Sequence, residues 1–185
     1  MVPVPKDSIT LSESQMAILA NPLRSRMVLA LRTGGACSMS ELALRLEVDP
    51  KILYYPLKKL TDAGLVWRTG STKSNRRIEG MYGLVAYRME LPKSAALETR
   101  KKLMRTTIRC AEQDATNAQE ASIVDPKVTD AMNVFRAPLW LSEDDRKELF
   151  QELSGLVEKY SSRSIRQEND LLMWTSLIVP VARRN

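Results

Sequence analysis

Lysine, tyrosine and leucine side chains recur at helical spacing between residues 50 and 63. Leucines at 53, 57 and 60 follow the i, i+4, i+7 pattern, so one face of a helix here would pack into a core. A different face would carry Lys51, Tyr54, Tyr55 and Lys58, with Lys59 beside them. Lysine can donate to guanine acceptors and phosphates, and tyrosine can contact phosphates or thymine methyls. The pattern predicts a helix that contacts DNA, and the alternatives are a solvated face or a Tyr55 that packs inside.

The excess positive charge of the chain is confined to one segment. Residues 51–88 contain eight lysines and arginines against two carboxylates, a net charge of +6 that equals the net charge of the whole chain. A sequence pI near 9.4 fits a polyanionic partner, although net charge alone indicates only non-specific attraction. The local excess favours a nucleic-acid surface at this segment.

A basic hairpin is predicted directly after that helix. Residues 65–69 and 78–87 are rich in β-branched and aromatic residues, and a polar stretch over 70–77 separates them. Its basic residues, Arg68, Lys73, Arg76 and Arg77, would contact phosphates or the minor groove. The alternative is a soluble sheet edge that its charges protect from aggregation.

Cap residues predict where the neighbouring helices begin. Ser38 and Glu41 form a capping box, which predicts a helix of about two turns that ends near Glu47. Asp49 as N-cap and Pro50 as first residue then start the DNA-contacting helix, which Gly64 closes after residue 63. Ser40 lies in the first turn of the earlier helix, where it could bring a phosphate to the helix N-terminus.

Two scaffold helices are predicted before the capping box. After a proline-containing lead-in over residues 1–10, a short helix over 12–19 ends at Asn21-Pro22. A second helix starts at Pro22 and runs to about Arg32, with Gly34-Gly35 as its stop.

A long helix is predicted from Lys93 to about Ser122. Its apolar seam consists of Leu97, Met104, Ile108, Ala111, Ala115 and Ala118, and Lys101 is its one polar member. Because the seam changes from large to small residues, it suits close packing against a second copy of the chain. We expect this seam to form a homodimer.

The C-terminal third is predicted to be a small α+β unit. Asp125-Pro126 marks a linker, a strand is expected over 134–141, and Ser142 caps a helix whose apolar residues, Leu149, Phe150, Leu153, Leu156, Val157 and Tyr160, should be buried. A second strand over 172–181 should be buried through Trp174 and Ile178. Phe135, Trp140 and Trp174 could instead line a site for a small-molecule effector, although core and dimer packing is the favoured interpretation.

Several function classes are excluded or disfavoured. The chain has no histidine, which excludes histidine-dependent acid–base catalysis and histidine-containing metal sites. Cys37 and Cys110 match neither a disulfide framework nor a metal or redox motif, and they are interpreted as small hydrophobic residues rather than as a thiol sensor. The sequence carries no nucleophile–base pair or phosphate-binding loop, so we expect no enzyme and no cofactor. Without a secretory signal or a membrane-spanning run, a cytoplasmic protein with no membrane partner is expected.

Residues from about 16 to 90 resemble the ArsR-type winged-helix regulators, in the subgroup with a C-terminal dimerisation region. The resemblance depends on Ala20-Asn21-Pro22-Leu23-Arg24, on Glu41-Leu42-Ala43, and on the run from Tyr54 to Val66. It implies a homodimeric regulator of transcription that binds a palindromic operator and is often released by a metal or small ligand. The metal-sensing branch carries a Cys-x-Cys pair where this chain has Glu41-Leu42-Ala43-Leu44, so metal sensing is not expected there.

Two departures from that family stand out. Glu47 lies in a turn where glycine is common, and Pro56 lies where many relatives carry a polar residue. As the seventh residue of the expected helix, Pro56 would remove the bond to the Ile52 carbonyl and kink the helix, at a cost of about 3 kcal/mol. The bend either aims the first turn at DNA or marks a helix that no longer reads DNA.

Together these observations predict an α+β chain. A winged helix-turn-helix domain over 1–92 is followed by a long dimerisation helix and a small α+β segment over 93–185. The expected function is a sequence-specific regulator of transcription, with repression favoured, that binds double-stranded DNA as a homodimer. The alternative is a winged-helix module that binds proteins and has lost specific DNA reading.

Overall fold

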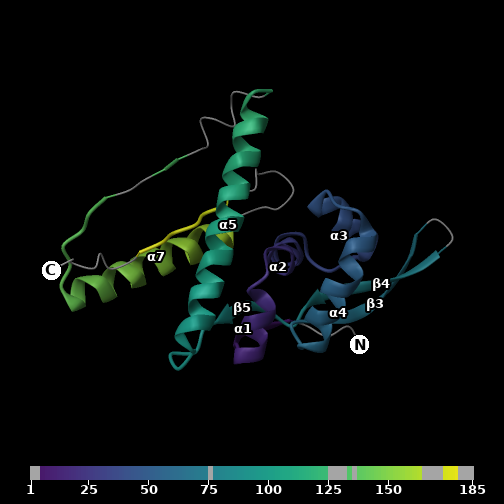
Figure 1. Ribbon diagram of the computed structural model, residues 1–185, viewed down its shortest axis with the longest axis horizontal. Helices are drawn as coiled ribbons and strands as arrows, with labels where there is room; N and C mark the ends of the chain where they lie inside the picture. The colour runs from purple at the N-terminus through teal and green to yellow at the C-terminus, as the bar shows by residue number, and fades with distance from the viewer. Residues whose placement is uncertain (1–4, 75–76, 125–132, 135–136, 164–172, 179–185) are drawn as a thin grey trace. The chain divides into compact units, whose positions relative to one another are not determined.

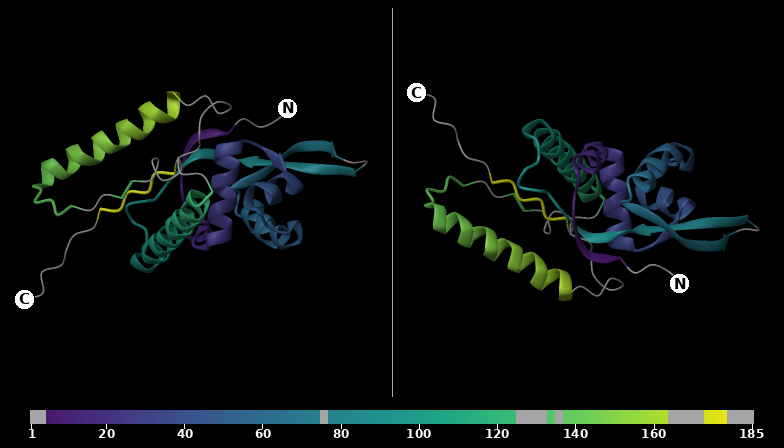
Figure 2. Two further views of the ribbon diagram at one scale, coloured as in Figure 1. Left: turned by 90° about the horizontal axis from the view of Figure 1, so that it is seen from above. Right: turned by 90° about the horizontal axis from the view of Figure 1, so that it is seen from below.

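The computed structural model describes residues 5–74, 77–124, 133–134, 137–163 and 173–178. The chain forms two compact units, Met1–Gln113 and Asp114–Asn185, and each has its own description below. The predicted division after residue 92 remains a prediction. Figures 1 and 2 show the course of the chain.

Four helical segments build the core of the first unit. They are α1 (Glu13–Leu19), α2 (Pro22–Gly34), α3 (Met39–Leu46) and α4 (Tyr54–Asp62), and a 3-10 turn, η1 (Pro50–Leu53), precedes α4. Ser38 is the N-cap expected for α3, and Ser12 and Asn21 cap α1 and α2 in addition; each of these three side chains accepts from a backbone amide of the first turn. At Ser38 the capping box is complete, with Glu41 Oε2 accepting from the Ser38 amide at 2.7 Å.

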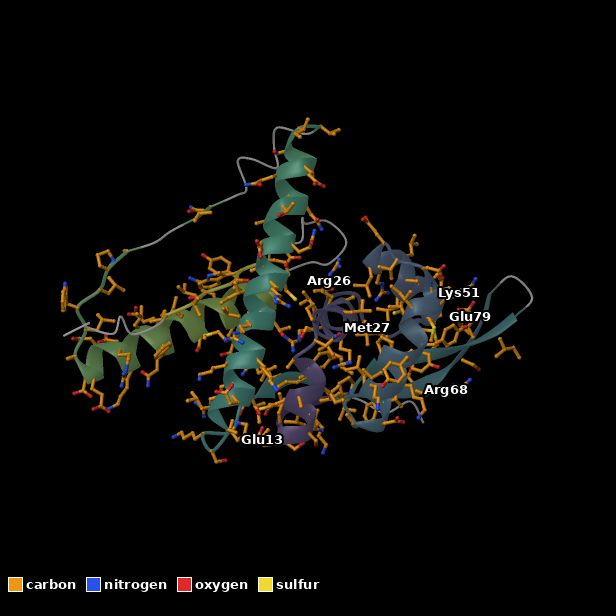
Figure 3. The ribbon with its side chains drawn as sticks, viewed as in Figure 1. Glu13, Arg26, Met27, Lys51, Arg68 and Glu79 are labelled. Carbon is orange, nitrogen blue, oxygen red and sulfur yellow. The ribbon has the colours of Figure 1, made fainter. Side chains whose placement is uncertain are left out.

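The core lies where these helices meet and is formed mainly by leucine and methionine. Met16, Met27, Leu42, Leu53, Leu60 and Leu65 are fully buried in it. Met27 of α2 lies in this packed region, whereas Lys51 lies at the outer end of the helical layer (Figure 3). The predicted core stripe at 53, 57 and 60 is confirmed, since these leucines are at most 2% exposed. One face of this helix therefore packs into the domain, and the other face is accessible for binding.

A three-stranded antiparallel sheet flanks the helices, in the order β2-β4-β3. The short β2 (Cys37–Ser38) pairs with β4 (Arg77–Leu84), which pairs with β3 (Val66–Ser74). In Figure 2 the β3–β4 hairpin extends beyond the helices. This is a winged helix-turn-helix, as predicted.

The hairpin is longer than expected. The stretch over 70–77 was predicted as a polar loop, but β3 continues through Ser74 and β4 resumes at Arg77. Threonine and lysine on the outer part pair across the ladder, with Thr72 opposite Glu79, and a bulge between Arg68 and Gly70 re-registers the strands. Backbone pairing extends the ladder although the side chains there show no apolar alternation.

A second, parallel ribbon was not predicted. The lead-in contains β1 (Lys6–Thr10), which pairs with β5 (Ala86–Glu90), so the strand expected over 78–87 divides into β4 and β5. Of the five β1 residues, Ile9 is the one apolar residue, and β1 therefore lacks the period-2 apolar pattern that marks a strand in sequence.

The helix expected from Pro50 to residue 63 starts as predicted, with the Asp49 side chain accepting from the Lys51 amide, but its first turn is a 3-10 turn and not part of the α-helix. The first four residues form η1, and α4 begins at Tyr54, so Pro56 is the third residue of α4 and not an interior one. First-turn amides have no partner within an α-helix, and the missing N–H of proline therefore costs no helical bond. The reason for which a kink was predicted at Pro56 is therefore absent.

The long helix is present as α5 (Leu97–Ser122), four residues later than predicted. Ala96 N donates to Glu13 Oε1 at 2.6 Å, which ties the start of α5 to α1. Leu103 packs against the core and Thr106 is buried, so this side of α5 faces the domain. The predicted seam lies on the other side of the helix.

In the second unit the helix α7 (Glu143–Arg163) is present, and its predicted cap is confirmed because Asp145 N donates to Ser142 Oγ at 3.1 Å. Its apolar residues are not buried as expected: Phe150, Leu156, Val157 and Tyr160 are exposed, and Leu149 and Leu153 are half-buried. The described parts of the two predicted strands, residues 134, 137–141 and 173–178, have no regular structure, and Trp140 and Trp174 are exposed. Phe135 and Asp125-Pro126 lie outside the described residues.

The fold class is confirmed at the level of the chain. It is α+β, with a winged helix-turn-helix domain, a long helix and a small C-terminal region. None of the helices in the described ranges is long and apolar enough to cross a membrane.

Candidate nucleic-acid interface

The turn between α3 and α4 sets the angle at which α4 leaves the domain. Glu47 caps α3 in the left-handed region, with φ 56° and ψ 45°, and its amide donates to the Leu44 carbonyl at 3.2 Å. Val48 N then donates to Ala43 O at 3.1 Å. The turn that glycine often supplies is therefore made by a residue that is strained there.

The predicted contact residues of α4 divide into two adjacent faces. Tyr54 and Lys58 are four residues apart and share one face, which Lys51 of η1 begins; all three are exposed. Tyr55 and Lys59 share a neighbouring face, where Lys59 Nζ lies 5.3 Å from the centroid of the Tyr55 ring. The structure brings Lys51, Tyr54 and Lys58 together and sets Tyr55 and Lys59 apart from them. Tyr55 is 65% exposed, so the alternative that it packs inside is wrong.

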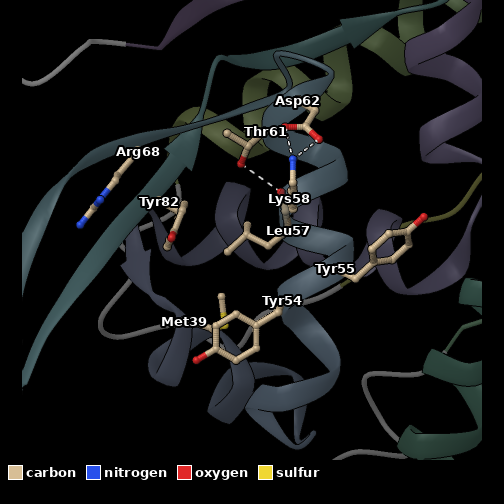
Figure 4. Close-up of a pocket in the computed structure, with 9 residues that line it drawn as sticks. All are labelled: Met39, Tyr54, Tyr55, Leu57, Lys58, Thr61, Asp62, Arg68 and Tyr82. Atoms are coloured by element: carbon tan, nitrogen blue, oxygen red, sulfur yellow. Dashed lines mark hydrogen bonds and ion pairs between the residues drawn. The ribbon is translucent and has the colours of Figure 1, made fainter.

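A shallow hollow of about 540 Å³ separates α4 from the hairpin. Its lining residues are Met39, Tyr54, Tyr55, Leu57, Lys58, Thr61, Asp62, Arg68 and Tyr82. Figure 4 shows the Tyr54 ring beside Met39, with Tyr55 turned to the other side of the helix. The floor is mainly apolar and the rim carries Lys58, Asp62 and Arg68, an arrangement suited to an apolar group flanked by charged or polar ones.

Lys58 is paired within its own helix. Its ammonium donates to both oxygens of Asp62, at 2.8 and 3.0 Å, in an i, i+4 arrangement (Figure 4). Both side chains are more than half exposed, so the pair contributes little to stability. From the sequence, Asp62 was counted among the acidic residues but was not assigned to the site, although its i, i+4 distance from Lys58 was a signal for pairing.

On the hairpin, Arg68 lies over a glycine of the opposite strand. A Cβ atom at Gly80 would lie 2.9 Å from Arg68 Nε and 3.2 Å from the Tyr82 hydroxyl. Gly80 therefore provides the space in which the Arg68 guanidinium and the Tyr82 hydroxyl lie. Arg68 is exposed and lies on β3 beside β4 (Figure 3), where it can reach a phosphate.

Ser40, predicted as a phosphate contact, is occupied by a carboxylate. Its hydroxyl donates to Glu79 Oε1 of β4 at 2.9 Å, which links the N-terminal turn of α3 to the hairpin. Glu79 Oε2 is buried without a hydrogen-bond partner among the described residues. A carboxylate at this place complements the positive end of the α3 dipole.

For the outer residues of the hairpin, the strand pairing of the backbone gives the position. Lys73 and Arg77 belong to β3 and β4, where Lys73 pairs with Ile78 and Ser74 with Arg77. Arg76 lies outside the described residues. These positions put the basic segment on the part of the hairpin that extends beyond the helices.

The predicted dimerisation residues are accessible in the single chain. Leu97 is 66% exposed, Met104 and Ile108 are also exposed, Ala111 is half-buried and Ala115 is exposed. Leu103 and Thr106 face the core instead, so α5 presents one face inward and the predicted seam outward.

Among the comparisons with known proteins, the family model identifies the helix-turn-helix. The family model described as a helix-turn-helix domain matches residues 19–67, from the end of α1 through the first residues of β3. A double mutant of Lactococcus lactis ZitR in apo form has 14% sequence identity over 79% of this chain and 87% of that chain, with a TM-score of 0.29. A single mutant of ZitR has 14% identity over 75% and 74%, with a TM-score of 0.30. Both are distant likenesses, and the comparison with curated proteins gave no match.

Proposed function

We propose that this chain is a sequence-specific, DNA-binding regulator of transcription of the ArsR type. The observation that carries the proposal is the face formed by Lys51, Tyr54 and Lys58, which is exposed on a helix whose opposite face is fully packed. It lies in the part of the chain that holds the whole +6 excess charge and that overlaps the helix-turn-helix match. A helix held in this way can enter a major groove while the hairpin follows the backbone.

In this proposal α4 reads bases and the hairpin supplies phosphate contacts. Lys51, Lys58 and Lys59 donate to bases or phosphates, and Tyr54 and Tyr55 contact phosphates or thymine methyls. Arg68, Lys73, Arg76 and Arg77 bind the backbone or the minor groove, and the Ser40 hydroxyl turns from Glu79 to a phosphate. Control is exerted by occupying a promoter, as a repressor does, and no catalytic step is involved.

We infer further that the regulator is a homodimer formed through the outward side of α5. Leu97, Met104, Ile108, Ala111 and Ala115 supply the contact, and two copies place their α4 helices on the two halves of a palindrome. Replacing Met104 and Ile108 by Glu should leave a folded monomer, as measured by light scattering after gel filtration. Lys102→Glu is the matched control, because it changes the charge by the same two units at another exposed position of α5. A double variant that stays dimeric would refute this interface.

The experiment that tests the proposal is selection of bound duplexes from a random-sequence pool at near-physiological salt. Enrichment of an inverted repeat, with half-sites about one helical turn apart, is the expected result. Retention without any enriched motif would refute sequence-specific reading, and no retention would refute DNA binding and favour the protein-interaction module. Lys58→Glu together with Arg76→Glu should abolish retention and flatten its salt dependence.

A further inference from the structure

Residues 51–88 hold only two carboxylates, and one of them lies on the proposed reading face. Asp62 lines the hollow between α4 and the hairpin, together with Tyr54, Lys58 and Arg68. A carboxylate on a surface that meets phosphates repels them, so it weakens every contact that does not depend on base sequence. In a protein that binds only the DNA backbone, a carboxylate at position 62 would weaken binding and bring no benefit.

The geometry of Asp62 indicates a benefit that depends on the bases. Its two oxygens lie 2.8 and 3.0 Å from Lys58 Nζ, which places a cationic donor directly beside an anionic acceptor on the exposed side of the helix. The Thr61 hydroxyl donates to Leu57 O at 2.9 Å and is thus occupied by its own helix. Tyr54 lies on the same face as Lys58, one turn before it. Lys58 and Asp62 are the charged pair that α4 offers to this hollow.

A donor next to an acceptor matches one edge in the major groove. Guanine offers the acceptors O6 and N7, to which lysine donates, and the paired cytosine offers its N4 amino group, from which aspartate accepts. An A·T pair presents adenine N7 and N6, an acceptor beside a donor, but these are the characteristic partners of asparagine and glutamine, whereas lysine prefers guanine and aspartate prefers the cytosine amino group. A phosphate offers acceptors alone, and it leaves Asp62 unpaired and repelled.

We propose that Asp62 is a specificity-determining residue, which together with Lys58 reads a G·C base pair in each half-site and disfavours phosphate-only binding. The proposal depends on the DNA-binding function proposed above. To bind a phosphate of non-specific DNA, Lys58 must either break its ion pair with Asp62 or bring the Asp62 carboxylate close to the phosphates. At the matching pair the two side chains stay together, each with a partner on the bases.

The test compares Asp62→Asn with the unchanged chain and with Asp144→Asn. Asp144 pairs with Lys147 at 3.1 Å on α7 in an i, i+3 arrangement, so the same substitution there removes the same charge and one exposed ion pair outside α4, the hairpin and the seam of α5. Asp62 is about half exposed and its replacement is isosteric, so the variant should fold normally. All three proteins go through random-pool selection and through titration with one fixed duplex of arbitrary sequence over a range of salt concentrations.

The expected result has two parts. Asp62→Asn should bind the arbitrary duplex about five-fold more tightly, with a log–log salt slope steeper by about 0.9, as one further phosphate contact gives. The enriched motif should lose its G·C requirement at one position per half-site, where adenine becomes acceptable to the asparagine. Asp144→Asn should change neither quantity.

Failure of this inference and failure of the proposed function look different. If the unchanged chain and Asp62→Asn enrich one motif with equal G·C preference everywhere, Asp62 does not determine specificity while the DNA-binding function stands. The same conclusion follows if Asp62→Asn binds the arbitrary duplex with the same affinity as Asp144→Asn. If the unchanged chain and Asp62→Asn both retain no duplex, the proposed function is refuted and this inference with it.

Discussion

Replacing Pro56 by Ala tests the position that the structure gives to this residue. Pro56 is the third residue of α4, which directly follows η1. An amide at this position makes no hydrogen bond within α4, so the missing N–H of proline removes none. Alanine therefore restores nothing in the folded state, and the unfolded chain gains conformational freedom, which lowers stability by about 0.4–1 kcal/mol. The pyrrolidine ring is half-buried, and removing its packing acts in the same direction.

We expect the free energy of unfolding of Pro56→Ala to lie between that of the unchanged chain and about 1 kcal/mol below it. Chemical denaturation followed by far-ultraviolet circular dichroism measures this difference. Pro50→Ala is the matched control, because Pro50 is the first residue of η1 and its N–H is equally unneeded. A gain of about 2 kcal/mol or more would refute the reasoning, since an interior proline costs about 3 kcal/mol that alanine would return.

Three further changes have defined outcomes. Ser38→Ala removes the capping box of α3 and should lower the free energy of unfolding by about 1 kcal/mol, measured by the same denaturation; an unchanged midpoint would contradict the role of the cap. Glu47→Gly should raise it by about 0.5–1 kcal/mol by relieving the left-handed backbone, and a decrease would show that Glu47 contributes more than its conformation. Burial raises the pKa of the Cys37 thiol, so the folded state favours its neutral form. The stability that this preference contributes should be fully present below the thiol pKa of the unfolded chain, about 8.5, and should fall as the pH rises above it. Cys37→Ala should lack this decrease in the free energy of unfolding at high pH.

The helical core was predictable because its signals are local. Ser38 begins α3 through its capping box with Glu41, and the Asp49 side chain accepts from the Lys51 amide where η1 begins. The buried leucines at 53, 57 and 60 are separated by full helical turns. Each of these features is encoded within eight consecutive residues or fewer, so a single stretch of sequence contains the whole signal.

The features that sequence did not reveal depend on distant partners or on hydrogen bonding. β1 has an exposed, polar sequence and is a strand only because β5 lies beside it. The change from η1 to α4 at Tyr54 alters which carbonyl each amide reaches while the side chains keep nearly the same period. Strands expected from the apolar residues near Trp140 and Trp174 were wrong, because apolar composition does not provide a neighbouring strand.

The candidate site was predicted as a set of cations, and its carboxylates were not assigned. Lys51, Tyr54, Lys58 and Arg68 are exposed on or beside α4, as their spacing indicated. Spacing along the helix could have placed Asp62 beside Lys58. Nothing local could have placed Glu79 beside Ser40, because 39 positions separate them and only the return of β4 toward α3 joins the two.

The parallel ribbon of β1 and β5 has a consequence for the order in which the domain folds. Lys6 N donates to Val85 O and Leu11 N to Glu90 O, both at 2.8 Å, so each end of the ribbon joins chain segments that enclose all the helices from α1 to α4. Closing so long a loop costs entropy that only an already assembled core can offset. The amide protons of β1 should therefore be protected last during refolding and exchange first in the native state. Hydrogen exchange at Lys6 and Leu11 would then report the completion of the domain just before the chain enters α5.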